Sequence, residues 1–188
     1  MYDFHYNYIK KKYGKKAKLL FTDTDSLTYE IKADDVYKDF WNDKDKFDNS
    51  DYPQKSPYFN KTNKKVIGKF KDEAAGVPIC EFVGLRSKMY SYIKDNQKGG
   101  KTAKGIKKNI IKNNITHLNY KETLFNREQM MHKMKTIRSD RHQLGSYEIN
   151  KVSLSCFDDK RYIYDDGIKS YAYGHYKKVN QTLKPTLK

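Results

Sequence analysis

Two aspartates separated by one residue, Asp23 and Asp25, have the type and spacing of a metal-binding pair. In a tight hairpin, residues i and i+2 project to the same side, so both carboxylates converge while Thr24 faces away. Like charges held this close repel each other, and a shared proton or a divalent cation relieves the repulsion. Hard oxygen ligands favour Mg²⁺ or Mn²⁺ with positions left for phosphate oxygens, an arrangement for phosphoryl transfer. Taken alone, the same residue types are more typical of an ordinary surface turn.

The strongly basic composition is the second feature with chemical consequences. Thirty-nine Lys and Arg against 23 Asp and Glu give a net charge of +16, which favours an anionic partner, above all nucleic acid. Half of this excess lies between Arg86 and Lys112, where nine basic residues accompany one acid. The segment 34–59 is instead acidic, and we expect it to face away from a phosphate backbone. The basic residues that we expect to contact DNA include Arg86, Lys104, Lys107 and Lys108.

The composition also argues against several classes of protein. Apolar stretches are only a few residues long, so we expect no transmembrane helix and no signal-peptide core after Met1. Cys80 and Cys156 lie far apart without metal-ligand spacing, which argues against zinc and suits a reducing compartment. The lysine run from Lys10 to Lys18 is either a nuclear address or the solvated face of a helix. We therefore expect an intracellular protein without a membrane partner.

The first half of the chain has the periodicity of one helix followed by strands. Tyr2, Tyr6, Ile9 and Tyr13 recur at helical spacing, and Gly14 is placed to end the helix. With 17 Tyr and 9 Phe, the core should be rich in aromatic side chains. A short helix and an irregular loop are expected over 34–59. One sheet should occupy the chain up to about residue 93, with strands at 19–22 and 27–31 around the hairpin tip 23–26, and at 66–71, 79–83 and 88–93.

The second half is expected to begin with helices and to end with strands. The Gly-Gly pair within 98–101 is interpreted as a hinge. Thr116 and Asn126 have the residue types of helix N-caps, and the methionines after Asn126 recur at helical spacing. Helices are expected around 106–111, 116–124 and 126–137, strands at 147–157, 161–164 and 168–176, and turns at 158–159 and 165–167.

Several motifs together resemble the family B DNA polymerases. Phe21-Thr22-Asp23-Thr24-Asp25-Ser26 resembles the palm motif Tyr-x-Asp-Thr-Asp-Ser of that family. Residues 81–90, with Lys88 and Tyr90, resemble the strand and Lys-x-Tyr motif of its protein-primed branch, which viruses and self-replicating transposons carry. Weaker similarity lies at residues 68–73, 104–106, 158–162 and 173–175. The resemblance extends from about Tyr2 to Tyr176.

The resemblance implies an α+β fold and a mechanism. It implies a partial palm over residues 1–93, an antiparallel sheet with a helix, and a thumb of helices and β-hairpins over 94–188. Asp23 and Asp25 would be the catalytic carboxylates that bind Mg²⁺ or Mn²⁺, and Lys88 and Tyr90 would hold the primer end. The implied partners are primer-template DNA, deoxynucleoside triphosphates and a terminal protein primer. Phe21 departs from the family Tyr and lacks its hydroxyl.

The same resemblance implies that parts of a polymerase are missing. We find neither the earlier Asp-x-x-Ser-Leu-Tyr-Pro motif, which supplies a further carboxylate, nor the fingers motif whose lysine grips the nucleotide. We therefore expect a C-terminal fragment that binds Mg²⁺ weakly and extends primers poorly or not at all. The alternative is a non-catalytic nucleic-acid-binding remnant of a mobile-element polymerase. A glycosyltransferase-like use of Asp-x-Asp ranks last, because it gives no reason for the charge of +16.

Overall fold

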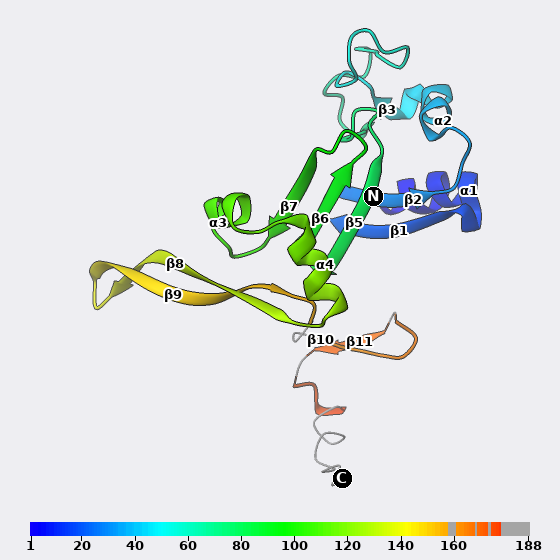
Figure 1. The fold of residues 1–188 in the computed structure, drawn as a ribbon. Helices are drawn as coiled ribbons and strands as arrows, with labels where there is room; N and C mark the ends of the chain where they lie inside the picture. Colours follow the sequence, from blue (N-terminus) through cyan, green and yellow to red (C-terminus); the bar gives the residue numbers. More distant parts are fainter. Residues whose placement is uncertain (158–160, 168, 173, 178–188) are drawn as a thin grey trace. The chain divides into compact units, whose positions relative to one another are not determined.

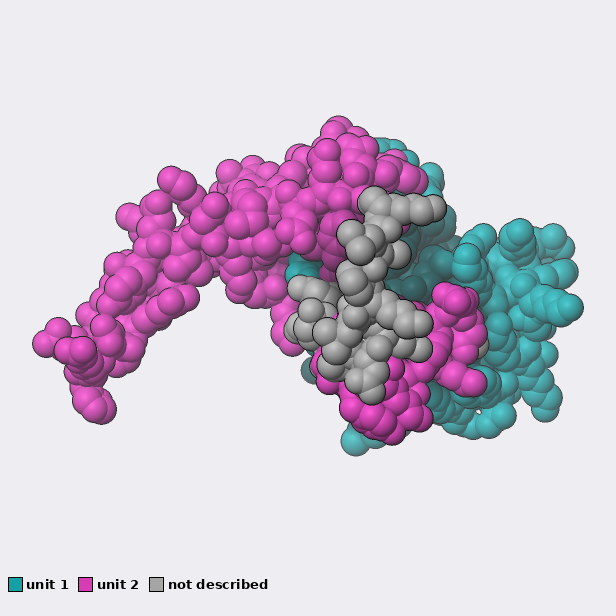
Figure 2. Space-filling model, turned by 90° about the horizontal axis from the view of Figure 1, so that it is seen from below, with its two compact units in different colours: residues 1–102 teal, residues 103–188 magenta. Residues whose placement is uncertain are grey.

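The chain contains helices and mostly antiparallel strands in separate runs, which confirms the expected α+β class (Figure 1). The structure, a computed structural model, describes residues 1–157, 161–167, 169–172 and 174–177. It divides into two units, residues 1–102 and 103–188, coloured separately in Figure 2. No helix in the described part of the chain is both long and apolar enough to cross a bilayer.

The predicted N-terminal helix is present and ends where the sequence indicates. It consists of the π-helical turn η1 (Phe4–Ile9), the α-helical turn α1 (Lys10–Tyr13) and the 3₁₀ turn η2 (Gly14–Lys16). Gly14 has a φ of +54°, which glycine adopts without the steric cost that a side chain would add. The α-helical part therefore ends at its C-cap Gly14, and one 3₁₀ turn leads from there into the first strand.

The hairpin around residues 23–26 is also confirmed. β1 (Ala17–Asp23) and β2 (Ser26–Ile31) pair antiparallel, and the register runs from the Ala17–Ile31 end to the tip. Ala17 is buried together with Ile9 and Tyr13 of the helix, and Ile31 packs against the same cluster. The cluster also contains Phe4, Tyr8, Tyr29 and Phe40, which fits the aromatic-rich core expected from composition. The helix thus supports one end of the hairpin, while the other end carries the two aspartates.

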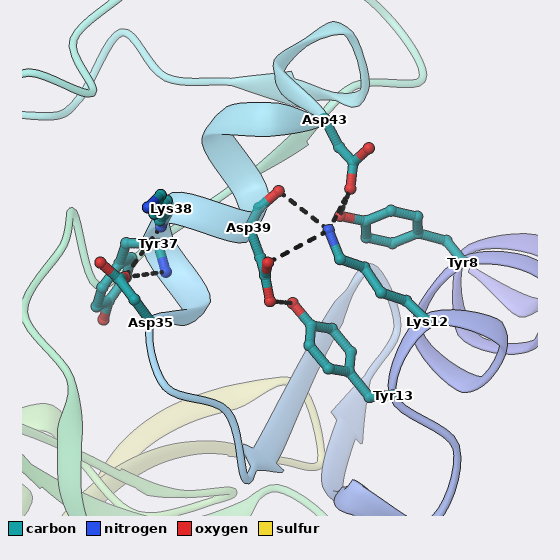
Figure 3. Close-up of polar contacts among 8 residues, drawn as sticks. All are labelled: Tyr8, Lys12, Tyr13, Asp35, Tyr37, Lys38, Asp39 and Asp43. Carbon is teal, nitrogen blue, oxygen red and sulfur yellow. Dashed lines mark hydrogen bonds and ion pairs between the residues drawn. The ribbon is translucent and has the colours of Figure 1, made fainter.

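Helix α2 (Val36–Asn42) is tied to the N-terminal helix by charged and phenolic groups (Figure 3). The Lys12 ammonium contacts the carboxylates of Asp39 and Asp43. Tyr13 donates a hydrogen bond to Asp39 at 2.9 Å, and Tyr8 donates one to Asp43 at 2.8 Å. Burial and the hydrogen bond to Asp43 raise the pKa of the Tyr8 phenol, so it stays a donor at neutral pH. These acids of the segment 34–59 therefore neutralise charge within their own unit.

The predicted strand over 66–71 is largely wrong. Only its last two residues form a strand, β4 (Phe70–Lys71), which pairs in parallel with β3 (Phe47–Asp48) after the 3₁₀ turn η3 (Lys44–Lys46). The segment 66–69 lies among turns: Lys65 just before it and Gly68 within it both have positive φ angles. Ile67 is almost fully exposed. Two apolar residues in a row suggested a strand, but no sheet face is there to cover them.

The largest sheet of the unit has the order β5-β6-β7. β5 (Ile79–Arg86) and β6 (Met89–Lys94) pair antiparallel and confirm two of the predicted strands, except that β6 starts one residue later than expected. One continuous sheet up to residue 93 is not formed, because the described strands of residues 1–102 belong to three separate sheets. Aromatic side chains, rather than backbone hydrogen bonds, connect the β1-β2 hairpin to β5 and β6.

The Gly-Gly pair is part of a strand and not a hinge. β7 (Gly99–Ala103) forms the edge of the sheet beside β6. A Cβ atom on Gly100 would lie 2.6 Å from the Tyr92 ring, and a Cβ atom on Gly99 would overlap the Tyr92 carbonyl oxygen. The interpretation as a hinge was wrong because these glycines permit close approach between strands rather than freedom of the chain.

Two short helices open the second unit, near the positions that the sequence predicts. α3 (Lys108–Asn113) begins two residues later than expected, and α4 (His117–Phe125) follows it. Thr116 is the N-cap of α4, and it forms a capping box with Asn119 in which each side chain accepts from the other residue's amide. Tyr120 and Thr123 of α4 are buried. The prediction from the Thr116 cap is therefore confirmed.

The predicted helix over 126–137 is wrong. That segment is β8 (Gln129–Asp140), which pairs along its whole length with β9 (Gln143–Ser155). Arg127 has a φ of +56°, which ends the helical path after α4. Met134 lies opposite Ile149 and Met130 opposite Leu154, so distant apolar partners outweigh the local helical spacing. β9 also confirms a strand near 147–157.

The tail contains one small hairpin. β10 (Arg161–Ile163) pairs antiparallel with β11 (Ser170–Ala172), and a turn lies at 165–167 as predicted. The strand expected over 168–176 is shorter than predicted within the described residues. The turn expected at 158–159 lies outside them.

Candidate functional site

The two candidate catalytic aspartates lie at a strained hairpin tip. Asp23 pairs with Ser26, so Thr24 and Asp25 form a two-residue turn in which the Asp25 amide donates to the Asp23 carbonyl at 2.6 Å. Thr24 has a φ of +56°, which is unfavourable for a β-branched residue and costs about 1–3 kcal/mol. Gly or Asn would relieve this strain at a turn with no other role. The turn therefore retains Thr24 and the two carboxylates at a cost in stability.

Lys88 lies against this tip from a second hairpin. Its ammonium contacts the Asp23 carboxylate at 2.8 Å, although the two residues are far apart in the sequence. The strand expected over 88–93 does not include Lys88, which belongs to the turn between β5 and β6 and has a φ of +56°. In this turn conformation the Lys88 side chain reaches Asp23, a contact that the sequence analysis did not predict. Two hairpin tips thus bring together the aspartate pair and one cation.

The electrostatics of the site favour a charged lysine. The hydrogen bond and the charge of Asp23, with smaller effects from Asp25 and Tyr90, raise the pKa of Lys88 above its usual value. The effect of Asp25 indicates that both carboxylates act on the same ammonium. Asp25 itself is exposed, whereas the side chain of Asp23 is 23% exposed. Asp25 is thus the more accessible carboxylate, and Asp23 is the partner of Lys88.

An aromatic cluster holds the two hairpins together behind the site. The Phe21 ring of β1 lies 4.3 Å from the Tyr90 ring and 6.1 Å from the Phe82 ring, measured between centroids. Gly84 lies opposite Tyr90 in the register, and a Cβ atom there would come within 3.1 Å of Phe82. The Phe21 ring thus packs without a hydroxyl. Tyr90 is thus a packing residue of the site. Phe82 belongs to the same aromatic cluster but was not predicted, although residues two apart on a strand, such as Phe82 and Gly84, share one face.

The aspartate pair matches part of a divalent metal site. Both residues offer the hard carboxylate oxygens that Mg²⁺ and Mn²⁺ prefer, and Mg²⁺ commonly uses only one or two protein carboxylates. Within the described ranges, no group of three His, Cys, Asp or Glu side chains is arranged to hold a metal ion. The pair therefore fits the carboxylate part of such a site, with the other positions left for water and phosphate.

The expected DNA-binding residues fall into both units. Arg86 ends β5 beside the turn of Lys88, whereas Lys104, Lys107 and Lys108 belong to the second unit and are exposed. Lys107 lines a cleft of about 300 Å³ between α3 and the strands β8 and β9. The other lining residues are Asn109, Ile110, Lys133, Met134, Lys135 and Glu148. Lys133 and Lys135 were missed because their segment was interpreted as a helix, yet their spacing of two is the signal of one strand face.

Comparison of the chain with protein-family models, curated proteins and solved structures finds no match. The distinctive features of the chain are the strained aspartate turn, its contact with Lys88 and the exposed lysines of the second unit.

Removal of the Lys88 charge is expected to strengthen Mn²⁺ binding at the turn. The ammonium and a metal ion at this turn would compete for the Asp23 carboxylate, and Lys88→Met removes that competitor. Lys88→Met should therefore lower the Kd for Mn²⁺, measured by electron paramagnetic resonance, by up to about fivefold. Lys32→Met removes the same charge from an exposed position and is the matched control. Equal Kd values for both variants would contradict competition at Asp23.

Proposed function

We propose that the Asp23–Asp25 turn and Lys88 form the metal-binding and phosphate-binding part of a DNA-directed DNA polymerase site. The observation that carries this proposal is the 2.8 Å contact between Asp23 and Lys88, which joins two hairpin tips that both contain non-glycine residues at positive φ. Backbone strain of this kind is concentrated at functional sites. Thr24 is the more unusual of the two, because it is β-branched, whereas six other non-glycine residues in the described part of the chain share a positive φ with Lys88.

Each residue has a distinct role in this proposal. Asp25, the more exposed carboxylate, and Asp23 would hold Mg²⁺ or Mn²⁺, which supplies charge neutralisation at the α-phosphate of a nucleotide. Lys88 moves from Asp23 to a phosphate of the primer end once the carboxylates are neutralised. Tyr90 and Phe21 position the two tips through their ring contact. Primer-template DNA and deoxynucleoside triphosphates are thus the proposed partners, with a terminal protein as a further primer.

A second candidate is a nucleic-acid-binding protein without catalysis. It is favoured by one observation, that the described residues offer no third acidic group around the pair. Both candidate functions predict binding to primer-template DNA. They differ in whether the aspartate pair binds a metal ion and transfers a nucleotide.

The aspartate pair is tested by Mn²⁺ titration of the full chain. Asp25→Asn should weaken Mn²⁺ binding about tenfold or more, because it removes one of two carboxylate charges from a site whose affinity depends on ligand charge. Asp34→Asn changes an exposed aspartate outside the turn and should leave the Kd unchanged. Indistinguishable Kd values for the two variants would show that the turn binds no metal ion.

Primer extension then separates the two candidates. The full chain is incubated with a primer-template, nucleotides and Mg²⁺, with and without Asp25→Asn. We expect weak extension at most, since two-metal transfer needs a further carboxylate. Extension that depends on Asp25 supports the polymerase site. DNA binding without any extension, together with equal Mn²⁺ affinities for Asp25→Asn and Asp34→Asn, favours the non-catalytic candidate.

A further inference from the structure

The β8-β9 ribbon is the longest strand pair in the described chain (Figure 1), and the residues around its turn are exposed. Its buried residues are Met134 in the middle of the ribbon and, at its base, Leu154 with the serines on either side. Every residue from Ile137 through the turn to Leu144 is exposed. A two-stranded ribbon without a covered face is only marginally stable in water, so a bound partner would stabilise this end.

Two aliphatic side chains occupy the exposed end on one face. Ile137 is 75% exposed and Leu144 is 80% exposed. The register pairs Ile137 with Ser146 and Ser139 with Leu144, so the two aliphatic residues are diagonal neighbours on the same side of the ribbon. Tyr147 belongs to the opposite face, where its ring lies over Gly145. The aliphatic pair is therefore a small apolar projection and not the edge of a core.

Basic residues lie near this apolar pair. The turn is made by Arg141 and His142, whose φ angles of +47° and +64° are those that Asn and Gly normally supply in a two-residue hairpin turn. Lys133 and Lys135 share the face of the aliphatic pair, nearer the cleft, whereas Arg138 pairs with Gly145 on the opposite face. Of the two acids of the ribbon, Glu148 contacts Lys133 at 3.7 Å and Asp140 lies beside the turn. Arg138 and Arg141 against Asp140 leave a small positive excess at the tip, next to two exposed aliphatic groups.

We propose that the ribbon tip enters a groove of duplex DNA and that Ile137 and Leu144 act as a wedge against a base step. A two-stranded ribbon fits a DNA groove, and Ile and Leu are residue types that DNA-bending proteins insert between bases. Arg138, Arg141 and His142 contact the flanking phosphates. The charge around the tip favours a polyanion over a protein partner. This inference rests on the proposed function, because both need affinity for duplex DNA.

The wedge is tested with duplex DNA that contains 2-aminopurine, whose fluorescence rises when it is unstacked. The wild-type chain should raise the fluorescence by about twofold or more, because insertion partly unstacks a base step. Ile137→Ser with Leu144→Ser should abolish the rise while the affinity falls less than about tenfold, since phosphate contacts supply most of the binding. Ile67→Ser changes an even more exposed isoleucine outside the ribbon and is the control. The circular dichroism spectrum of each variant shows that it folds.

The remaining outcomes separate this inference from the proposed function. DNA binding without a fluorescence rise would overturn the wedge and leave the metal site of the proposed function intact. A wedge signal together with equal Mn²⁺ affinities for Asp25→Asn and Asp34→Asn would support the wedge and overturn that metal site. Absence of duplex binding would overturn the wedge. Binding to vesicles of anionic phospholipid that is lost in the double Ser variant, without a DNA signal, would assign the tip to a membrane surface and overturn the proposal.

Discussion

A fourfold rise in salt, from about 50 to about 200 mM KCl, should weaken binding of this chain to duplex DNA about 500-fold. The expectation assumes about five phosphate contacts, for which the logarithm of affinity falls with the logarithm of salt at a slope near −4.5. These contacts would come from the lysines around the cleft, such as Lys107, Lys133 and Lys135, and from Arg141 at the ribbon tip. For single-stranded DNA the slope should be near −3.5 and the loss about 130-fold. Fluorescence anisotropy at several salt concentrations measures both slopes.

Charge variants locate the contacts that cause this salt dependence. Lys133→Gln with Lys135→Gln should reduce the magnitude of the slope by about 1.8, because each lost phosphate contact contributes about 0.9. Lys55→Gln with Lys64→Gln removes the same charge from exposed positions in the loop of the first unit, and it should leave the slope nearly unchanged. A flat salt response of the wild-type chain would remove nucleic acid as the partner.

Gly99→Ala should destabilise the first unit by about 3 kcal/mol or more. A Cβ atom at this position would overlap the carbonyl oxygen of Tyr92, a backbone atom that cannot move without disturbing the pairing of β6 with β7. Ser91, which is buried, donates from its hydroxyl to the Gly100 carbonyl at 3.2 Å, so a shift of β7 would also strain that bond. Urea unfolding followed by circular dichroism measures the change in the free energy of unfolding.

Gly84→Ala is the matched control in the same sheet. Its Cβ atom would meet only the edge of the Phe82 ring, at 3.1 Å, and a side chain can shift by a few tenths of an ångström. We expect its free energy of unfolding to stay within about 1 kcal/mol of the wild-type value. If Gly99→Ala were as well tolerated as Gly84→Ala, the close approach of β6 and β7 would be incorrect, and the interpretation of the glycine pair as a hinge would return.

Several local elements could be predicted because nearby residues determine them. The N-terminal helix ends at Gly14, whose positive φ needs no distant partner. The β1-β2 hairpin forms where alternating apolar residues flank a polar tip, and α4 begins at the Thr116 capping box. In each case the stop, turn or cap lies within a few residues of the pattern that it ends.

Predictions failed where a distant segment decides the conformation. The methionines of β8 have helical spacing, but the partner residues of β9 make them a strand. The glycine pair at 99–100 is fixed by Tyr92 of the neighbouring strand, and no local feature of the pair shows this. In both segments the pairing partner is decided by cross-strand contacts, which periodicity within one segment cannot reveal.

The amino-acid sequence by itself determined the basic charge, the α+β class and the hairpin that presents Asp23 and Asp25. Only the tertiary structure decided that Lys88 leaves its strand and contacts Asp23, that Phe21 and Tyr90 join the two hairpins, and that the segment after α4 is a ribbon. Hairpin turns and helix caps depend on short-range backbone preferences, which the local sequence encodes. Contacts between hairpin tips depend on how separate elements pack, and their energies come from residues far apart in the chain.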